Sequence, residues 1–173
     1  MKKIVSVILA LVMLFCTFVL SSCYSNSNNN NVEQNNTQNK QNNTQKEKEF
    51  YDLVDETKDL LDTVADDIYS YWYDCIYNDK YLENISYAVA CAKKDNQTNI
   101  DTIEANTSKI KDLYKQIKDG KLGTEAKAVM QAYNDYYTLV IEVSGSFNSY
   151  SASKETCKKE LASALDDFSF ELD

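Results

Sequence analysis

The sequence predicts an all-α protein, an antiparallel bundle of about four helices behind a disordered tether rich in Asn and Gln. Three observations predict it. Apolar residues recur at three- and four-residue steps from Phe50 to the C-terminus, and no segment keeps the alternation of a β-strand. The connections between the periodic stretches are short, which favours antiparallel neighbours in an up-down bundle.

The N-terminus has the pattern of a signal peptide. Lys2 and Lys3 give a basic start, and the chain from Ile4 to Leu20 is apolar except for Ser6 and Thr17. This stretch is slightly short for a transmembrane helix, which needs about 20 apolar residues. A basic flank, an apolar stretch and small residues at its exit are typical of an export signal, so we expect residues 1–22 to be removed.

The exit of this segment, Leu20-Ser21-Ser22-Cys23, resembles the lipobox of bacterial lipoproteins. The resemblance implies cleavage before Cys23, diacylglycerol on its thiol, and an acyl chain such as palmitate on its freed amine. Two buried chains anchor a protein stably, at roughly 0.8 kcal/mol per methylene. We therefore expect the chain to be held at the extracytoplasmic face of the cell membrane through the lipid on Cys23.

The segment 23–49 is expected to be a disordered tether behind the lipidated cysteine. From Tyr24 to Glu49, ten of the 26 residues are Asn and four are Gln, with one isolated valine. Such a segment buries too little apolar surface to offset the entropy of ordering. Thr44 and Glu47 have capping-box spacing, so the first helix is expected to begin near Glu47.

The folded domain is expected to span residues 50–173, and its first helix to run from Glu47 to Tyr77. Seven acidic residues follow the face opposite the apolar stripe, and we expect a solvated surface there. The expected inward residues are Phe50, Leu53, Val54, Leu60, Leu61, Val64, Ile68, Tyr71, Trp72, Cys75 and Ile76. The acidic residues are Asp52, Asp55, Glu56, Asp59, Asp62, Asp66 and Asp67.

Three further helical stretches follow. The second runs from Glu83 to Ile117, and polar residues near 95–99 leave open whether it is continuous or breaks there. Gly120 and Gly123 bracket a turn. The third and fourth helices are expected at 124–143 and 153–172. The inward residues of the third are Ala126, Val129, Met130, Tyr133, Tyr137, Val140 and Ile141. Those of the fourth are Cys157, Leu161, Ala164, Leu165, Phe168 and Leu172.

Two segments of this domain resemble small helical proteins of low-GC Gram-positive bacteria. They are Ile68-x-x-x-Trp72-Tyr73-x-x-Ile76-Tyr77 and the junction from Ser144 to Ser151. They cover about a fifth of the domain. The resemblance implies a helical fold and a Gram-positive host, and it implies no activity.

Missing residue types exclude much of catalytic chemistry. The chain has no histidine and no arginine, and its three glycines build no phosphate-binding loop. This excludes His-dependent triads, His-containing zinc sites and bidentate arginine clamps. Asp95–Asp101 spaces oxygen ligands like a calcium loop but lacks the turn glycine. We expect no enzyme, catalytic residue, metal site or cofactor, with a carboxylate-based hydrolase as the one enzymatic alternative.

The charge is strongly acidic. Without Lys2 and Lys3, 16 lysines remain against 27 acidic residues, a net charge near −11. Phosphate backbones repel such a surface, so we expect no nucleic-acid partner.

Three cysteines remain after Cys23, namely Cys75, Cys91 and Cys157. Each is interpreted as a small buried hydrophobe, and whether two of them form a disulfide stays open. Cys75 with Cys157 is the favoured pair if one forms.

Tyr69, Tyr73 and Tyr77 are the candidate partner-binding residues. They recur every four residues and form one row beside the inward stripe, at the end of the helix farthest from the tether. Aromatic rings there either cover the end of the core or stack on a wall glycan, a peptide or an envelope protein. The expected function is a lipid-anchored interaction module. The alternative is a passive structural or accessory subunit of a membrane complex, such as a transporter or a phage-exclusion system.

The lipobox makes the first testable prediction. Cys23→Ala removes the thiol that would carry diacylglycerol, so we expect labelling with a radioactive fatty acid to stop and uncut or shed chain to accumulate. Labelling and membrane fractionation of cells with either form measure this. A Cys23→Ala chain that is still processed and still sediments with membranes would rule out the lipid anchor.

Overall fold

The structure is a computed structural model that describes residues 31–172, with side chains from residue 42 onward. The expected signal peptide and Cys23 lie outside the described residues. The chain divides into two units, Met1–Glu33 and Gln34–Asp173, and the second holds the folded domain.

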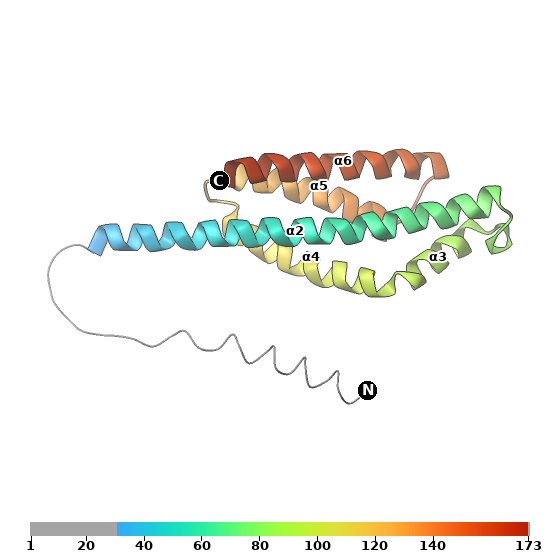
Figure 1. Ribbon diagram of the computed structural model, residues 1–173, viewed down its shortest axis with the longest axis horizontal. Coiled ribbons are helices and arrows are strands. Elements are labelled where there is room, and N and C mark those ends of the chain that lie inside the picture. The colour runs from blue at the N-terminus through green and yellow to red at the C-terminus, as the bar shows by residue number, and fades with distance from the viewer. Residues whose placement is uncertain (1–30, 173) are drawn as a thin grey trace, which may run out of the picture. The chain divides into compact units, whose positions relative to one another are not determined.

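The described part of the chain is helical and contains no strand, which confirms the expected all-α class (Figure 1). The chain runs along α2, returns along α3 and α4, goes out along α5 and comes back along α6 (Figure 1). These are four antiparallel passes, with the second pass in two pieces. The elements are α2 (Asn31–Tyr77), η1 (Tyr81–Glu83), α3 (Ile85–Asp95), α4 (Gln97–Ile117), α5 (Gly123–Ile141) and α6 (Phe147–Leu172).

Helix α2 begins at Asn31, well before the expected start at Glu47. The capping-box start at Thr44 is therefore wrong, because helical backbone already passes through it. The described side chains from Asn42 to Gln45 are exposed, and the first buried one belongs to Glu47. A helix makes its hydrogen bonds internally, so its backbone can continue beyond the core that stabilises it. As expected of a tether, these four side chains stay outside the core.

The apolar stripe of α2 forms the centre of the core. Phe50, Val54, Leu61, Val64 and Ile68 are fully buried, and Trp72 is nearly so. The other helices contribute Ile103 and Ile110 from α4, Val129, Tyr133 and Tyr136 from α5, and Tyr150, Leu161 and Phe168 from α6. Tyr136 takes the inward position that we expected for Tyr137, which is only partly buried. Ile76, expected inside, is exposed.

The second pass breaks at Asn96, between α3 and α4. The Asn96 amide is buried and donates to Asp67 Oδ2 of α2 at 2.8 Å and to the Ala92 carbonyl at 3.1 Å. Asn99 donates to Asn96 Oδ1 at 3.1 Å. The polar residues of this face thus satisfy one another at the break, which settles the question that the sequence left open.

The α4–α5 connection requires glycine at one position. A Cβ built on Gly123 would lie 2.1 Å from the Lys118 carbonyl oxygen, a distance that no side chain tolerates. Glu47 is buried beside this turn, and desolvation raises the pKa of its carboxyl group.

Helix α6 begins at Phe147 rather than at Ser153. Gly145 turns the chain with φ of +88°, which favours glycine. Ser146 and Ser149 then cap the helix reciprocally: Ser149 N–H donates to Ser146 Oγ at 3.2 Å, and Ser146 N–H donates to Ser149 Oγ at 2.9 Å. The serine-rich stretch lacks an apolar period, so the periodic pattern alone placed the start one and a half turns late.

Within residues 31–172, no helix has both the length and the apolar character needed to cross a bilayer.

The buried tyrosines make stability sensitive to alkaline pH. Tyr133 and Thr107 share a buried hydrogen bond of 2.6 Å, and burial raises the pKa of Tyr133 to about 12. The phenol ionises near pH 10 in the unfolded chain but stays protonated in the folded one, so the unfolded state binds fewer protons above pH 10. The contribution of Tyr133 to the free energy of unfolding is therefore complete below pH 10 and is lost as pH rises towards 12.

We predict that Tyr133→Phe reduces the alkaline loss of stability by about 2 kcal/mol between pH 10 and 12. Urea unfolding of the full chain at a series of pH values measures it. If the wild-type and Tyr133→Phe curves fall in parallel over this range, Tyr133 does not carry the effect.

Candidate functional site

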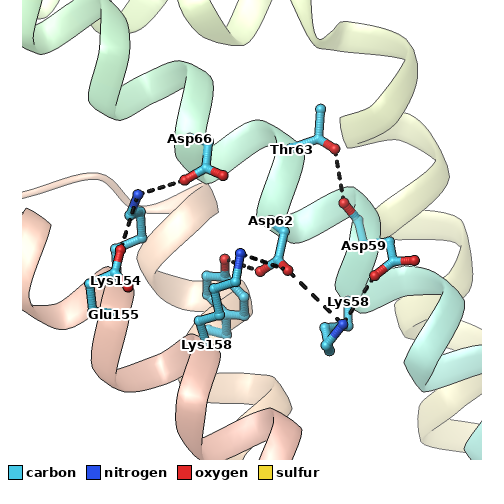
Figure 2. Close-up of polar contacts among 9 residues, drawn as sticks. Lys58, Asp59, Asp62, Thr63, Asp66, Lys154, Glu155 and Lys158 are labelled. Carbon is cyan, nitrogen blue, oxygen red and sulfur yellow. Dashed lines mark hydrogen bonds and ion pairs between the residues drawn. The ribbon is translucent and has the colours of Figure 1, made fainter.

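The inner carboxylates of α2 bind lysines of α6. Figure 2 shows Asp66 facing Lys154, and Asp62 between Lys58 and Lys158. The Lys154 Nζ to Asp66 Oδ1 distance is 2.5 Å, and the Lys158 Nζ to Asp62 Oδ2 distance is 3.1 Å. The second oxygen of Asp62 accepts from the Tyr136 hydroxyl at 2.7 Å.

Five of the seven residues of the acidic stripe are exposed, as expected of a solvated surface, whereas Asp62 and Asp67 are partly covered. Asp62 is mostly covered, and the Lys154 side chain is 9% exposed. Burial of Lys154 is the largest single effect and opposes its charged form, but the hydrogen bonds to Asp66 and Glu155 and the charges of these carboxylates together raise the pKa of the amine. The contacts of Asp62 and Asp66 with Tyr136, Lys154 and Lys158 hold α2 against α5 and α6.

A carboxylate-based hydrolase needs two carboxyl groups that are free to meet a substrate. Asp62 and Asp66 are instead engaged by lysines and by the Tyr136 hydroxyl. The described residues also contain no group of three or more His, Cys, Asp or Glu side chains that could hold a metal ion. Asp62 and Asp66, engaged in this way, therefore form no candidate catalytic centre.

The three described cysteines are free, so the favoured pair of Cys75 with Cys157 is not formed. Lys154 and Lys158 flank Cys157 and contact Asp66 and Asp62, which places Cys157 at that level of α2. Cys75 lies nine residues beyond Asp66, about 14 Å farther along the helix at 1.5 Å per residue. A disulfide requires Cα atoms within about 7 Å.

The tyrosine row lies against the start of α6. The Tyr69 ring stacks on Phe147 with centroids 5.0 Å apart, and Lys154 Nζ lies 4.7 Å from the centre of the Tyr69 ring. Tyr73 and Tyr77 contact the same Phe147 ring at 6.2 and 6.1 Å. Phe147 therefore covers one side of all three rings.

Exposure increases along the row. Tyr69 is partly buried, Tyr73 is 42% exposed and Tyr77 is 57% exposed, with the last two rings 4.7 Å apart. Tyr69 therefore belongs mainly to the cover of the core, whereas Tyr73 and Tyr77 present a ring edge or face to solvent.

The turn after α2 has a strained backbone, and it exposes the apolar side chain of Leu82 to solvent. Asp79, Tyr81, Leu82 and Glu83 all have φ between 52° and 56°. Non-glycine residues in this left-handed region cost about 1 kcal/mol or more each. Leu82 is nevertheless 88% exposed, so its side chain contributes nothing to the core in return.

Exposed large hydrophobic residues gather at this end of the bundle. Of the seven among the described residues, six lie between residues 73 and 87. The seventh, Phe170, is near the C-terminus, at the other end of α6. We call the six the far-end surface: Tyr73, Ile76, Tyr77, Leu82, Ile85 and Tyr87.

Sequence reasoning found two of these six residues. Tyr73 and Tyr77 followed from their spacing on α2, but Ile76 was assigned to the core and Leu82 fell in a connection. Ile85 and Tyr87 fell in the second helical stretch. The adjacent Tyr81 and Leu82, within a connection that is otherwise polar or charged, were the one signal that could have identified Leu82.

No protein-family model matches the chain, and no curated protein or solved structure matches it either. Function must therefore be argued from the far-end surface itself.

Proposed function

We propose that this chain is a lipid-anchored interaction module of the cell envelope, and that the far-end surface contacts its partner. The partner would be a protein, a peptide or a glycan outside the membrane. The anchor would be the lipid on Cys23, and the acidic tether-proximal half would serve solubility.

One observation carries the proposal: among residues 42–172, six of the seven exposed large hydrophobic residues lie at one end of the bundle, around a strained turn. Solvent-facing apolar clusters of this kind mark contact sites, whereas scattered single residues do not. Folding does not require Leu82 to be apolar, since its side chain is 88% exposed. A contact made by Leu82 outside the domain would account for both the strain and the side chain.

The position of the surface fits a tethered module. Helix α2 runs from Asn31 to Tyr77, so the far-end surface lies at the end of α2 that is opposite to its N-terminus (Figure 1). A partner beyond that end of the bundle would contact this surface.

A different feature favours the alternative, an accessory subunit held along its flank. A groove of about 540 Å³ runs between α2 and α4, with Leu53 and Leu113 in it. Charged residues border it, namely Glu49, Asp52, Glu56, Lys109 and Asp112. A helix of a membrane complex packed there would contact Lys109 rather than Leu82.

Photo-crosslinking in intact cells distinguishes the two. A photoreactive amino acid at position 82 should give a defined crosslinked product, and the same amino acid at Phe170, 82% exposed at the other end, should not. Tyr77→Ala should lower the yield from position 82 by about 5-fold or more, the loss of roughly 1 kcal/mol or more at an aromatic anchor.

Products from position 109 without products from position 82 would favour the accessory subunit. Equal products from positions 82 and 170 would mean that the far-end surface has no special contact, and the proposed function would be wrong.

A further inference from the structure

The groove between α2 and α4 has an apolar floor and charged rims. Leu53 of α2 and Leu113 of α4 form the floor, and both side chains are partly exposed although they pack against the core. Its volume of about 540 Å³ lies within the range of ligand-binding sites, about 300–1,000 Å³. None of its lining residues belongs to the far-end surface, so the groove is a separate surface of the domain.

Two side-chain contacts fix α2 and α4 relative to each other at the groove. Before Leu53 in the chain, the Phe50 ring lies 6.5 Å from the Tyr114 ring of α4, centroid to centroid. After Leu53, Asn106 Nδ2 of α4 donates to Thr57 Oγ1 at 3.2 Å, and both of these side chains are buried. The floor is therefore formed without a partner, and binding requires no opening of the two helices.

The α2 rim carries two carboxylates that no cation among residues 42–172 neutralises. Glu49 and Glu56 are exposed, and neither forms an ion pair with these residues. Glu49 accepts a hydrogen bond from the neutral amide of Gln45 at 3.0 Å. The two carboxylates are seven residues apart, which is about two turns and about 10 Å along one face of α2.

The α4 rim carries a free cation. Lys109 is exposed and forms no ion pair or hydrogen bond within the part of the chain whose side chains are described. Asp52 pairs with Lys48 at 2.9 Å, within α2. Asp112 pairs with Lys115 at 2.9 Å, within α4. The unpaired charges at the groove are therefore two carboxylates on the α2 side and one ammonium group on the α4 side.

We propose that this groove binds an amphipathic helix of a partner protein. The apolar residues of that helix pack on Leu53 and Leu113, as in other grooves that recognise one face of a helix. Two basic residues seven positions apart on one flank lie beside Glu49 and Glu56, because seven residues span the same two turns on both helices. An acidic residue on the other flank lies beside Lys109. The inference concerns a different surface from the proposed function and does not rest on it.

Synthetic peptides of about 15 residues, roughly four helical turns, test this pattern. The matching peptide has leucines at three- and four-residue steps, two lysines two turns apart on one flank and a glutamate on the other. In the second peptide glutamine replaces both lysines. The third has the composition of the first in an order without an apolar face.

Calorimetric titration of the full chain measures binding, in about 0.15 M salt, which screens exposed charges beyond about 8 Å. We expect the matching peptide to bind saturably, with one peptide per chain. The glutamine peptide should bind about 3- to 10-fold more weakly, because it loses two exposed charge pairs. The rearranged peptide should bind at least about 10-fold more weakly, because it cannot bury a row of leucines.

Two pairs of variants locate binding at the groove. Glu56→Lys and Asp55→Lys make the same change of net charge at adjacent exposed positions, but only Glu56 lines the groove. Glu56→Lys should weaken the matching peptide by about 5-fold or more, and Asp55→Lys by less than about 2-fold.

Leu113→Gln and Leu139→Gln both replace partly buried leucines, and only Leu113 lies in the groove. Leu113→Gln should weaken the matching peptide by about 5-fold or more, and Leu139→Gln should leave its binding unchanged. The lysine pair of variants decides the outcome if Leu113→Gln does not fold.

Four results would overturn the proposal. They are a matching peptide that does not bind, a glutamine peptide that binds as tightly, a rearranged peptide that binds as tightly, and equal weakening by Glu56→Lys and Asp55→Lys. The titration does not involve the partner of the far-end surface, so either proposal can fail alone. Crosslinks from position 82 without peptide binding would reject the groove, and peptide binding without crosslinks from position 82 would reject the proposed function.

Discussion

Burial of the apolar stripe of α2 is the constraint on which the rest of the structure depends. Phe50 at one end of the stripe meets Tyr114 of α4 and Phe168 of α6, and Trp72 at the other end meets Phe147 and Tyr150. The stripe is therefore enclosed by helices that come from later in the chain. Its burial also brings Asp62 and Asp66 to the edge of α6, where Lys158 pairs with the mostly covered Asp62 and Asp66 pairs with the buried Lys154.

The same constraint explains why one end of the bundle differs from the rest. Figure 1 shows α2 continuing past the α5–α6 connection towards the turn that leads into α3. Phe147 covers one side of the tyrosine row, but no described helix covers Ile76 or Leu82 in the same way. Ile76 and Leu82 are apolar although the bundle leaves them exposed, and the partner that we propose would cover them.

The fold was predictable from the sequence because a three- and four-residue period identifies helices without knowledge of their neighbours. The sequence did not predict which of the adjacent Tyr136 and Tyr137 points inward. The two residues differ by 100° around the helix, and the contact of Tyr136 with Asp62 fixes Tyr136 inside. Because α6 begins at Phe147, Cys157 lies ten residues beyond the start of that helix rather than four residues beyond the expected start at Ser153. The α5–α6 connection, from Glu142 to Ser146, could not be shaped from a periodic pattern either, since it depends on the positive φ of Gly145.

The central claim is that the far-end surface is dispensable for folding. It is tested most directly by the free energy of unfolding of Trp72→Ala and Tyr77→Ala in the full chain, from urea titrations. The account predicts a loss of about 3–5 kcal/mol for Trp72→Ala, whose ring is buried. It predicts a loss within about 1 kcal/mol for Tyr77→Ala, whose ring is more than half exposed. Equal losses for the two variants would show that Tyr77 belongs to the core and would contradict the account.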